Sequence, residues 1–260
     1  MAVDTAPKKN IIVCGYPKSG TTWLSRLIAE LVDCPFMGSF GYSDGVALEG
    51  ATRTSDYDCY KSHHTSDALL SRRIGEWFRI IYIVRDPRDV AISAAHYFQT
   101  DVFPMNRGSS RLIAALNARA SRLVPYAFRR RRSIRAVLYG DDSVNVWLAA
   151  SWRDHCLPFL HSGALTVKYE DLLNEPENQC TRILSHLGVP RSREDVSKAI
   201  ANQSFQEKKR HFKAQGLAFE YAFLRRGGHG YWRDELGRKQ KRLFAAELGT
   251  ELVRLSYPVD

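Results

Sequence analysis

Residues 11 to 32 read IIVCGYPKSGTTWLSRLIAELV, and this stretch decides the fold. The apolar run Ile11 to Cys14 predicts a short buried strand. The segment Thr21 to Val32 predicts an amphipathic helix, because its leucine and isoleucine residues recur at i, i+3, i+4 and i+7. The loop between them therefore joins the carboxyl end of a strand to the amino end of a helix, where free N–H groups and the helix dipole favour an anion.

This loop is similar to a nucleotide-triphosphate P-loop but departs from its pattern. Gly15 and Gly20 keep the glycine spacing of GxxxxGK[ST], yet Thr21 stands where the lysine belongs and the lysine is Lys18 instead. A P-loop kinase or NTPase is one alternative for the function. Two features count against this alternative: the loop lacks the lysine at its usual position, and no clear apolar strand ends in a magnesium-binding aspartate.

The same order of elements repeats along the chain. Ile80 to Val84 predicts a strand, and Asp86-Pro87 after it is typical of a helix start. Leu165 to Tyr169 predicts another strand, followed by a helix over Pro176 to Leu187 that Gly188 ends. Strands alternating with helices predict an α/β fold with a central, mainly parallel sheet flanked by helices. No convincing linker interrupts the chain, so we expect a single domain over residues 1–260.

Two segments are expected to be excursions over the strand ends, Phe36 to Tyr57 and Phe103 to Asp142. Such segments usually shape access to a site. The segment Phe212 to Gly230 is expected to be mostly loop. A final helical stretch could supply an apolar stripe from Leu236, Leu243, Leu248, Leu252 and Leu255.

The composition is that of an ordered globular protein. The chain has 260 residues, of which 44% are hydrophobic and 25% charged. The five cysteines are far apart and form no CxxC pair, which predicts reduced, mostly buried thiols. The short apolar run after the first ten residues does not predict a signal peptide or a membrane anchor. A cytoplasmic location is the default expectation.

The formal net charge of +10 favours an anionic partner. Part of that charge lies in two clusters, Arg129 to Arg135 and Arg238 to Arg242, and either one could simply be a solvated helix face. A basic nucleic-acid-binding protein is therefore a second alternative. No zinc-finger spacing, RNP motif or basic zipper accompanies the charge, so we expect no nucleic-acid partner.

Three motifs together resemble the family of sulfotransferases that use 3′-phosphoadenosine 5′-phosphosulfate (PAPS), most of all the cytosolic branch. They are YPKSGTTW at 16–23, IVRDPRDVAISAAHYF at 83–98 and FLRRGGHGYW at 223–232. The resemblance implies an enzyme that moves the sulfuryl group from PAPS to a hydroxyl or an amine of a small-molecule acceptor, without a metal. The other product is 3′-phosphoadenosine 5′-phosphate (PAP).

The resemblance gives the first motif a role in holding the donor. Its 5′-phosphate would be cradled by the backbone and hydroxyls of Ser19, Gly20, Thr21 and Thr22. Lys18 would stabilise the charge that develops at the bridging oxygen as the sulfur–oxygen bond breaks. Trp23 would stack on the adenine.

The second and third motifs imply a site for the donor's 3′-phosphate. In the family an arginine and a serine at the positions of Arg85 and Ser93 grip that phosphate. A helix-cap network around Arg85 is the alternative interpretation. From the third motif, Arg225, Arg226 and Gly227 are expected to close over the same phosphate, although Tyr231 stands where an acidic residue is common.

Two aromatic residues match family positions around the adenine. They are Tyr169 in VKYEDL and Phe205 in NQSFQEKK. The family often has a threonine at the position of Gln203, so for Phe205 a core aromatic remains an alternative.

The acceptor needs a general base, and CYKSHHT at 59–65 supplies a candidate. In a strand, Lys61 and His63 point to one face. The family's lysine-x-histidine motif falls here, which implies that His63 is the catalytic base and that Lys61 stabilises charge on the transferring group. His64 is the alternative base, since a register slip of one residue would exchange the two histidines.

The resemblance leaves the acceptor and the oligomeric state open. Family acceptors include phenols, steroids, amines and sugars, and the two excursions match none of them in particular. A homodimer is one option, although the family's short dimerisation motif is not evident around Lys213 to Glu220. No membrane partner is expected.

Overall fold

The structure is a computed structural model, and it describes residues 8–43, 46–72, 77–98, 124–217, 224 and 226–259. The chain divides into two compact units. The first comprises residues 1–15, 19–85 and 158–228, and the second residues 16–18, 86–157 and 229–260. Arg225 of the third motif lies outside the described residues.

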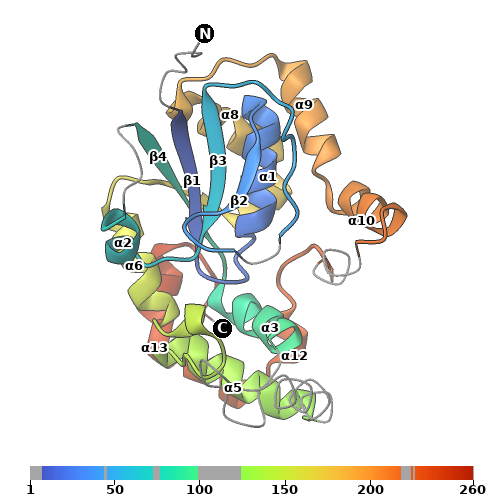
Figure 1. The fold of residues 1–260 in the computed structure, drawn as a ribbon. Helices are drawn as coiled ribbons and strands as arrows, with labels where there is room; N and C mark the ends of the chain where they lie inside the picture. Colours follow the sequence, from blue (N-terminus) through green and yellow to red (C-terminus); the bar gives the residue numbers. More distant parts are fainter. Residues whose placement is uncertain are drawn as a thin grey trace, which may run out of the picture. The chain divides into compact units, whose positions relative to one another are not determined.

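The first unit contains a parallel sheet with strand order β2-β3-β1-β4-β5 (Figure 1). This confirms the central parallel sheet predicted from the alternation of strands and helices. The strands are β1 (Lys9–Gly15), β2 (Phe36–Ser39), β3 (Tyr57–Ser62), β4 (Phe78–Val84) and β5 (Leu165–Lys168). β1 is the central strand of the sheet. The side chains of Ile11 to Cys14 are apolar and fully buried on both of its faces, as a parallel sheet covered on two sides requires.

The register places the carboxyl ends of four strands at one edge. Cys14 of β1 is opposite Ser62 of β3, Gly15 is opposite Ile83 of β4, and Val84 is opposite Lys168 of β5. The residues that directly follow these strands therefore emerge at the same edge. In open parallel sheets this edge is where ligands bind, beside the strand at which the order reverses.

One face of the sheet packs on helices α1 (Thr21–Val32) and α8 (Pro176–Leu187), and α9 (Arg193–Asn202) packs on these two helices. α1 and α8 have the bounds that the sequence predicted, and Gly188 ends α8 in the left-handed conformation with φ 68°. Ile11 and Val13 point to this core, together with Leu24 and Leu27 of α1. On the other face, Tyr82 stacks on Phe159 with ring centroids 4.6 Å apart. The described residues of this unit also form helices α2 (Ser66–Leu70), α7 (Tyr169–Asn174) and α10 (Phe205–Ala214).

The second unit is helical in the part that the structure describes. It contains α3 (Pro87–Tyr97), α5 (Tyr126–Tyr139), the 3-10 turn η2 (Val146–Leu148), α12 (Trp232–Glu235) and α13 (Arg238–Arg254), and α6 (Trp152–His161) begins in it. Asp86 caps α3 by accepting the Arg88 backbone N–H, and Pro87 occupies the first turn, as predicted. α5 packs on α3 and on α13.

The arginine cluster and the leucine stripe are placed by these helices. Residues 129–135 belong to α5, where Arg131 and Arg135 are exposed, while Arg130 donates to the Glu235 carbonyl at 2.6 Å. In α13 the buried stripe contains Leu248 and Leu252 as expected, but Phe244 rather than Leu243 is fully buried. The predicted stripe therefore holds at Leu236, Leu248 and Leu252 but misses the buried Phe244.

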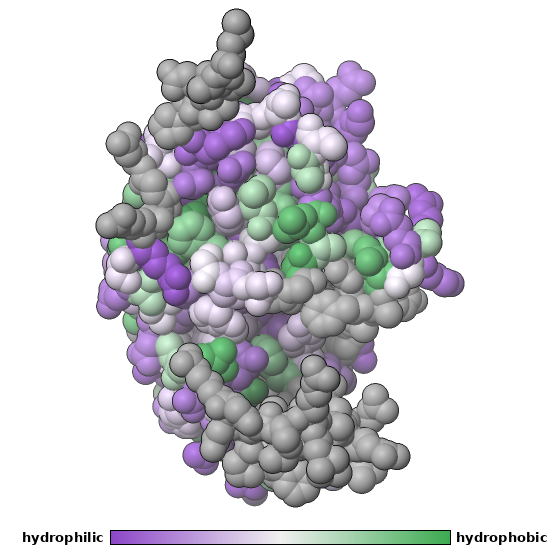
Figure 2. Space-filling model, viewed as in Figure 1, coloured by the Kyte–Doolittle hydropathy of each residue, from purple (hydrophilic) through white to green (hydrophobic). Residues whose placement is uncertain are grey.

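Among the residues described, no helix is long and apolar enough to cross a membrane. The face shown in Figure 2 is largely hydrophilic, with smaller apolar patches between the polar residues. Met37 and Leu48 are among the large apolar side chains that are exposed.

Candidate functional site

The loop after β1 has the geometry of an anion cradle. Lys18 has φ 72° and Gly20 has φ 96°, so both adopt the left-handed conformation immediately before α1 begins. A non-glycine residue held in that conformation is typical of functional loops. The hydroxyls of Ser19 and Thr21 are buried, and neither has a hydrogen-bond partner among the described residues. Two orphaned buried hydroxyls at a helix amino terminus fit a bound phosphate.

Aromatic side chains lie directly beside this loop. A Cβ atom built at Gly20 would lie 2.6 Å from Cδ2 of Tyr169, the residue that follows β5. Trp23 packs edge-on against Tyr169, with ring centroids 5.6 Å apart. The indole N–H of Trp23 donates to the Gln203 carbonyl at 2.8 Å. The structure thus brings Trp23, Tyr169 and the loop together.

Phe205 meets the third motif. A Cβ atom built at Gly227, where φ is 64°, would lie 2.3 Å from Cδ2 of Phe205. Only glycine allows the backbone to pass this close to the ring. Phe205 is half-buried at the start of α10, and Arg226 is exposed.

Arg85 joins the second motif to the third. It follows β4, and its guanidinium donates to the Gly228 carbonyl at 2.9 Å. Its Cζ lies 4.3 Å from the centroid of the Tyr169 ring. Arg88, by contrast, binds the Asp86 carboxylate at 2.8 Å. Arg85 therefore contacts the third motif and the Tyr169 ring. These contacts go further than the helix-cap network that was the alternative interpretation.

His63 and His64 have different surroundings. His63 follows β3 and is half-buried, and its Nδ1 lies 2.7 Å from the Gly15 carbonyl oxygen. A carbonyl only accepts, so Nδ1 carries the proton and the lone pair of a neutral ring is on Nε2. His64 is buried, with Nδ1 2.9 Å from the Ser62 hydroxyl and its ring edge-on to Tyr42. The pKa of His64 is lowered to about 4, mainly by burial and to a smaller extent by the positive charge of Arg72.

The four remaining expected residues lie on different segments. Thr22 is buried in the first turn of α1. Lys61 is buried in β3. In the second unit, the Lys18 ammonium lies 3.4 Å from the centroid of the Tyr97 ring, a cation–π contact. Ser93 is half-buried in α3.

Sequence reasoning missed the role of Asp89. Its buried carboxylate accepts hydrogen bonds from the backbone N–H groups of Gly230 and of Trp232, the latter at 3.0 Å. The Arg88 guanidinium lies 3.6 Å from the Trp232 ring centroid. The end of the third motif is therefore fixed by the charged residues of the second. The repeated Asp in RDPRD was the available signal, since a cap requires only the first.

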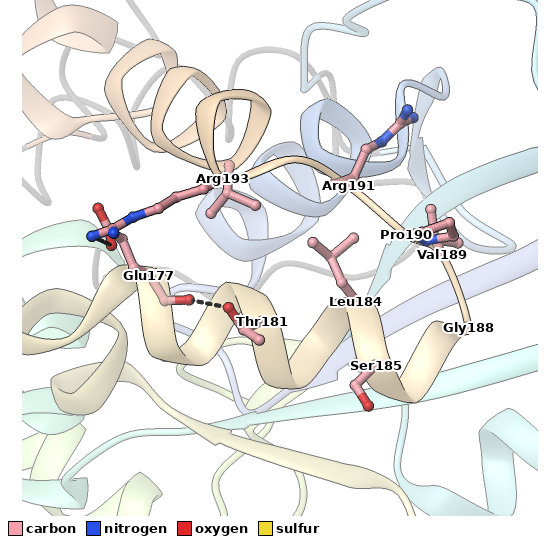
Figure 3. Close-up of a pocket in the computed structure, with 10 residues that line it drawn as sticks. Glu177, Thr181, Leu184, Ser185, Gly188, Val189, Pro190, Arg191 and Arg193 are labelled. Atoms are coloured by element: carbon pink, nitrogen blue, oxygen red, sulfur yellow. Dashed lines mark hydrogen bonds and ion pairs between the residues drawn. The ribbon is translucent and has the colours of Figure 1, made fainter.

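A separate pocket of about 590 Å³ lies between α8 and α9 (Figure 3). It is lined by Glu177, Leu184, Val189 and Arg193, among others, and by no residue of the three motifs. Arg191 at its edge donates to the carbonyls of Leu31 and Val32 at 2.7 and 2.8 Å. This arginine caps the carboxyl end of α1, so its contacts there are structural.

Comparison with known families decides the class of the protein. A model described as the sulfotransferase domain matches residues 8–252. The chain belongs to the sulfotransferase family. This agrees with the resemblance of the three motifs, which lie within the matched range.

Individual relatives support the assignment. Sulfotransferase 1A1 of Bos taurus is 23% identical over 268 residues, which cover 94% of this chain and 83% of the relative. Sulfotransferase 2B1 of Homo sapiens is 24% identical over 255 residues, which cover 90% of this chain and 64% of the relative. A crystal structure of mouse sulfotransferase SULT7A1 complexed with PAP matches with a TM-score of 0.67 and 21% identity, covering 95% of this chain and 85% of the other. Retinol dehydratase in complex with androsterone and PAP matches with a TM-score of 0.61, 16% identity, and coverage of 95% and 81%.

The sulfotransferase therefore transfers a sulfuryl group from PAPS to an acceptor, and its family acts on small molecules. This favours the predicted transferase over the P-loop kinase or NTPase alternative.

Proposed function

We propose that this enzyme transfers the sulfuryl group to a hydroxyl, or to an amine, of a small-molecule acceptor, with His63 as the general base. The observation that carries the proposal is the pair of orphaned buried hydroxyls, Ser19 and Thr21, in the loop that Gly15 opens. His63 is hydrogen-bonded to that same Gly15. The proposed phosphate cradle and the proposed base are thus anchored to one strand end.

In this proposal the loop holds the 5′-phosphate of PAPS. Ser19, Thr21 and Thr22 offer hydroxyls, and Gly20 at the start of α1 offers its backbone N–H. No acidic side chain stands in the first turn of α1 to repel the phosphate. The orphaned hydroxyls support this role because a phosphate oxygen would satisfy them.

The adenine would lie among Trp23, Tyr169 and Phe205. The contact between Trp23 and Tyr169 and the packing of Phe205 on Gly227 support it. The 3′-phosphate would be bound by Arg85, Ser93, Arg225, Arg226 and Gly227. The support for Arg85 is its contact with Gly228, because it links the guanidinium to the glycine-rich third motif.

The acceptor proton would move to Nε2 of His63. The hydrogen bond to Gly15 supports this because it fixes the proton on Nδ1 and leaves Nε2 basic. PAPS supplies a sulfuryl group whose bond to the phosphate oxygen breaks as the acceptor oxygen, or nitrogen, bonds to sulfur. PAP then leaves with the electron pair of the broken bond.

Lys18 and Lys61 would stabilise the negative charge that develops during the transfer. Lys18 would neutralise the phosphate oxygen that gains charge as the bond breaks, and Lys61 would do so at the transferring group. The left-handed backbone of Lys18 supports a functional role. We propose that no metal takes part.

Four further expectations stay predictions. They are a single sulfotransferase domain over residues 1–260, a cytoplasmic location, the absence of a nucleic-acid partner, and the option of a homodimer. The family match over residues 8–252 supports the first, because it runs through both compact units.

The test is to incubate the purified protein with PAPS and a panel of phenols, alcohols and amines, and to analyse the products by mass spectrometry. We expect one or more acceptors to gain the mass of SO₃, with an equal amount of PAP formed. PAPS turnover that gives only inorganic sulfate with every acceptor class would contradict the proposal.

A further inference from the structure

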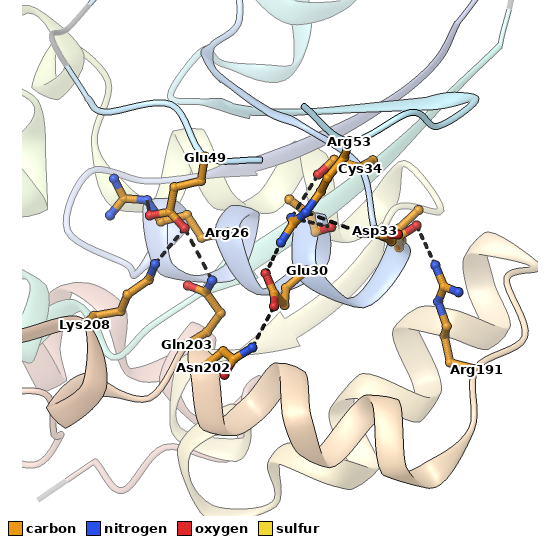
Figure 4. A network of polar contacts seen from close by, with 12 residues as sticks. Arg26, Glu30, Asp33, Cys34, Glu49, Arg53, Arg191, Asn202, Gln203 and Lys208 are labelled. Atoms are coloured by element: carbon orange, nitrogen blue, oxygen red, sulfur yellow. Dashed lines mark hydrogen bonds and ion pairs between the residues drawn. The ribbon is translucent and has the colours of Figure 1, made fainter. Parts of the chain in front are cut away.

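Glu49 is the centre of a cluster of charged and polar side chains that all lie outside the three motifs (Figure 4). Its carboxylate is 2.9 Å from Nε of Arg26 and 2.6 Å from Nζ of Lys208. The side-chain amide of Gln203 donates to the same carboxylate at 3.4 Å. These partners come from α1, α10 and the end of α9, so one side chain joins three helices.

Each partner of Glu49 is directly connected to a proposed adenine contact. Arg26 lies three residues after Trp23 in α1, and Lys208 lies three residues after Phe205 in α10, a spacing that puts each pair on one side of its helix. The third partner, Gln203, accepts the indole N–H of Trp23 with its carbonyl. The positions of both aromatic residues therefore depend on what holds these three residues.

The cluster is buried enough for its charges to matter. The side chain of Arg26 is 7% exposed, and its Cζ lies 5.6 Å from the Phe36 ring centroid and 5.1 Å from that of Phe212. Lys208 is 12% exposed. Removing the carboxylate that contacts both cations would weaken the compensation of two largely buried charges, which costs more than losing an exposed ion pair.

Glu49 itself is held by backbone at the edge of the sheet. Its carbonyl accepts the N–H of Phe36, the first residue of β2, at 2.8 Å. The carboxylate is thereby fixed on a strand while the helices carry its partners. A rigid counter-charge of this kind can set the spacing of α1 and α10.

We propose that Glu49 is a positioning residue for the adenine side of the donor site, acting through Arg26, Gln203 and Lys208 on Trp23 and Phe205. The inference rests on the proposed donor site. It assigns to the segment after β2, which sequence reasoning linked only to acceptor access, a role in donor affinity.

The chain offers a matched control in a second ion pair, Arg53 with Glu30. Glu30 lies in α1, as Arg26 does, and its side chain is 20% exposed, against 21% for that of Glu49. Its partner Arg53 comes from the same segment as Glu49. Arg53 also donates to the carbonyls of Ala29 and Cys34 at 3.3 and 3.2 Å. Glu30 hydrogen-bonds to Arg53 and Asn202, and its charge acts on Lys208 only through space, without the direct contact that Glu49 makes.

The experiment compares Glu49→Gln with Glu30→Gln in the full chain. Calorimetric titration measures the Kd for PAP, with inorganic phosphate as a probe of the cradle alone, and thermal unfolding measures stability. We expect Glu49→Gln to weaken PAP binding about tenfold and to raise KM for PAPS equally, with kcat within about twofold. Phosphate binding should not change, and Glu30→Gln should bind PAP like the wild type.

A purely structural role predicts a different result. If both variants lower the melting temperature similarly and Glu49→Gln leaves the Kd for PAP unchanged, the inference is wrong. Should Glu49→Gln fail to fold, Lys208→Met tests the same contact, and unchanged PAP affinity there would equally overturn it. A wild-type protein that does not bind PAP would instead refute the proposed donor site, so the two failures are distinguishable.

Discussion

The Nδ1 atom of His63 lies 2.7 Å from the carbonyl oxygen of Gly15, the last residue of the strand that leads into the proposed phosphate loop. This bond sets the tautomer of the ring and its orientation together. The same contact separates His63 from its neighbour, because His64 turns its Nδ1 to Ser62 instead.

The first prediction is that His63→Asn removes the base while keeping its hydrogen bond. The asparagine amide can donate to the Gly15 carbonyl in place of Nδ1, but it offers nothing at the position of Nε2. We expect kcat to fall by about 10² to 10⁴ with PAP affinity unchanged. Steady-state assays with PAPS and calorimetry with PAP measure the two effects.

His64→Asn is the control for this prediction. Its amide can likewise replace Nδ1 opposite Ser62, so kcat should stay within a few-fold of the wild type. If His64→Asn abolishes turnover and His63→Asn does not, the assignment of the base must be reversed.

The second prediction concerns acid stability and His64. Its pKa is lowered to about 4 in the folded protein, first by burial and then by Arg72, whereas the unfolded chain titrates near 6.5. The unfolded state therefore binds more protons between these values, and the folded state loses stability as the pH falls from 6.5 toward 4. The loss from this group is about 1 to 3 kcal/mol at pH 4.

Urea unfolding of wild type and His64→Gln at a series of pH values measures this effect. The variant should be less sensitive to acid over this window, because its side chain does not titrate. Equal pH dependence for both proteins would mean that His64 is not the group responsible.

The third prediction assigns the 3′-phosphate to Arg85. Arg85→Lys keeps the positive charge but loses the planar fork that can serve Gly228 and a phosphate at once. We expect the Kd for PAP to rise about tenfold or more, while that for adenosine 5′-phosphate, which lacks the 3′-phosphate, changes little. Calorimetry with the two nucleotides measures the difference. An equal loss for both ligands would place Arg85 elsewhere in the site.

Local signals in the sequence were sufficient for the sheet and its first helix. The apolar run before Gly15 and the leucine spacing after Thr21 predicted β1 and α1, and the bounds of α1 agree to the residue. Asp86-Pro87 and Gly188 act through their own backbone preferences, so they marked helix ends without tertiary information. The confirmed parallel sheet followed from the order of these elements.

Contacts between distant residues could not be predicted in the same way. Asp89 reaches Gly230 and Trp232, and Glu49 reaches Lys208, over more than a hundred residues of sequence. No periodicity or turn preference encodes such pairs, because they depend on how whole elements pack. The burial of Phe244 rather than Leu243 in α13 was missed for a related reason, since it depends on how that helix packs.

The final prediction concerns the close approach of Tyr169 to Gly20. The φ of 96° disfavours any L residue, and a Cβ atom there would lie 2.6 Å from the Tyr169 ring, so Gly20→Ala must displace the ring or the loop. We expect a loss of about 1 to 3 kcal/mol in the free energy of unfolding, measured with urea, and weaker PAP binding, because both proposed donor contacts move. Gly249→Ala is the control. It lies in α13 with no described atom within 4 Å of a built Cβ, so it should stabilise the protein by about 0.5 to 1 kcal/mol and leave PAP affinity unchanged. A Gly20→Ala protein as stable as the wild type, with unchanged PAP affinity, would show that Tyr169 does not need to lie against the loop.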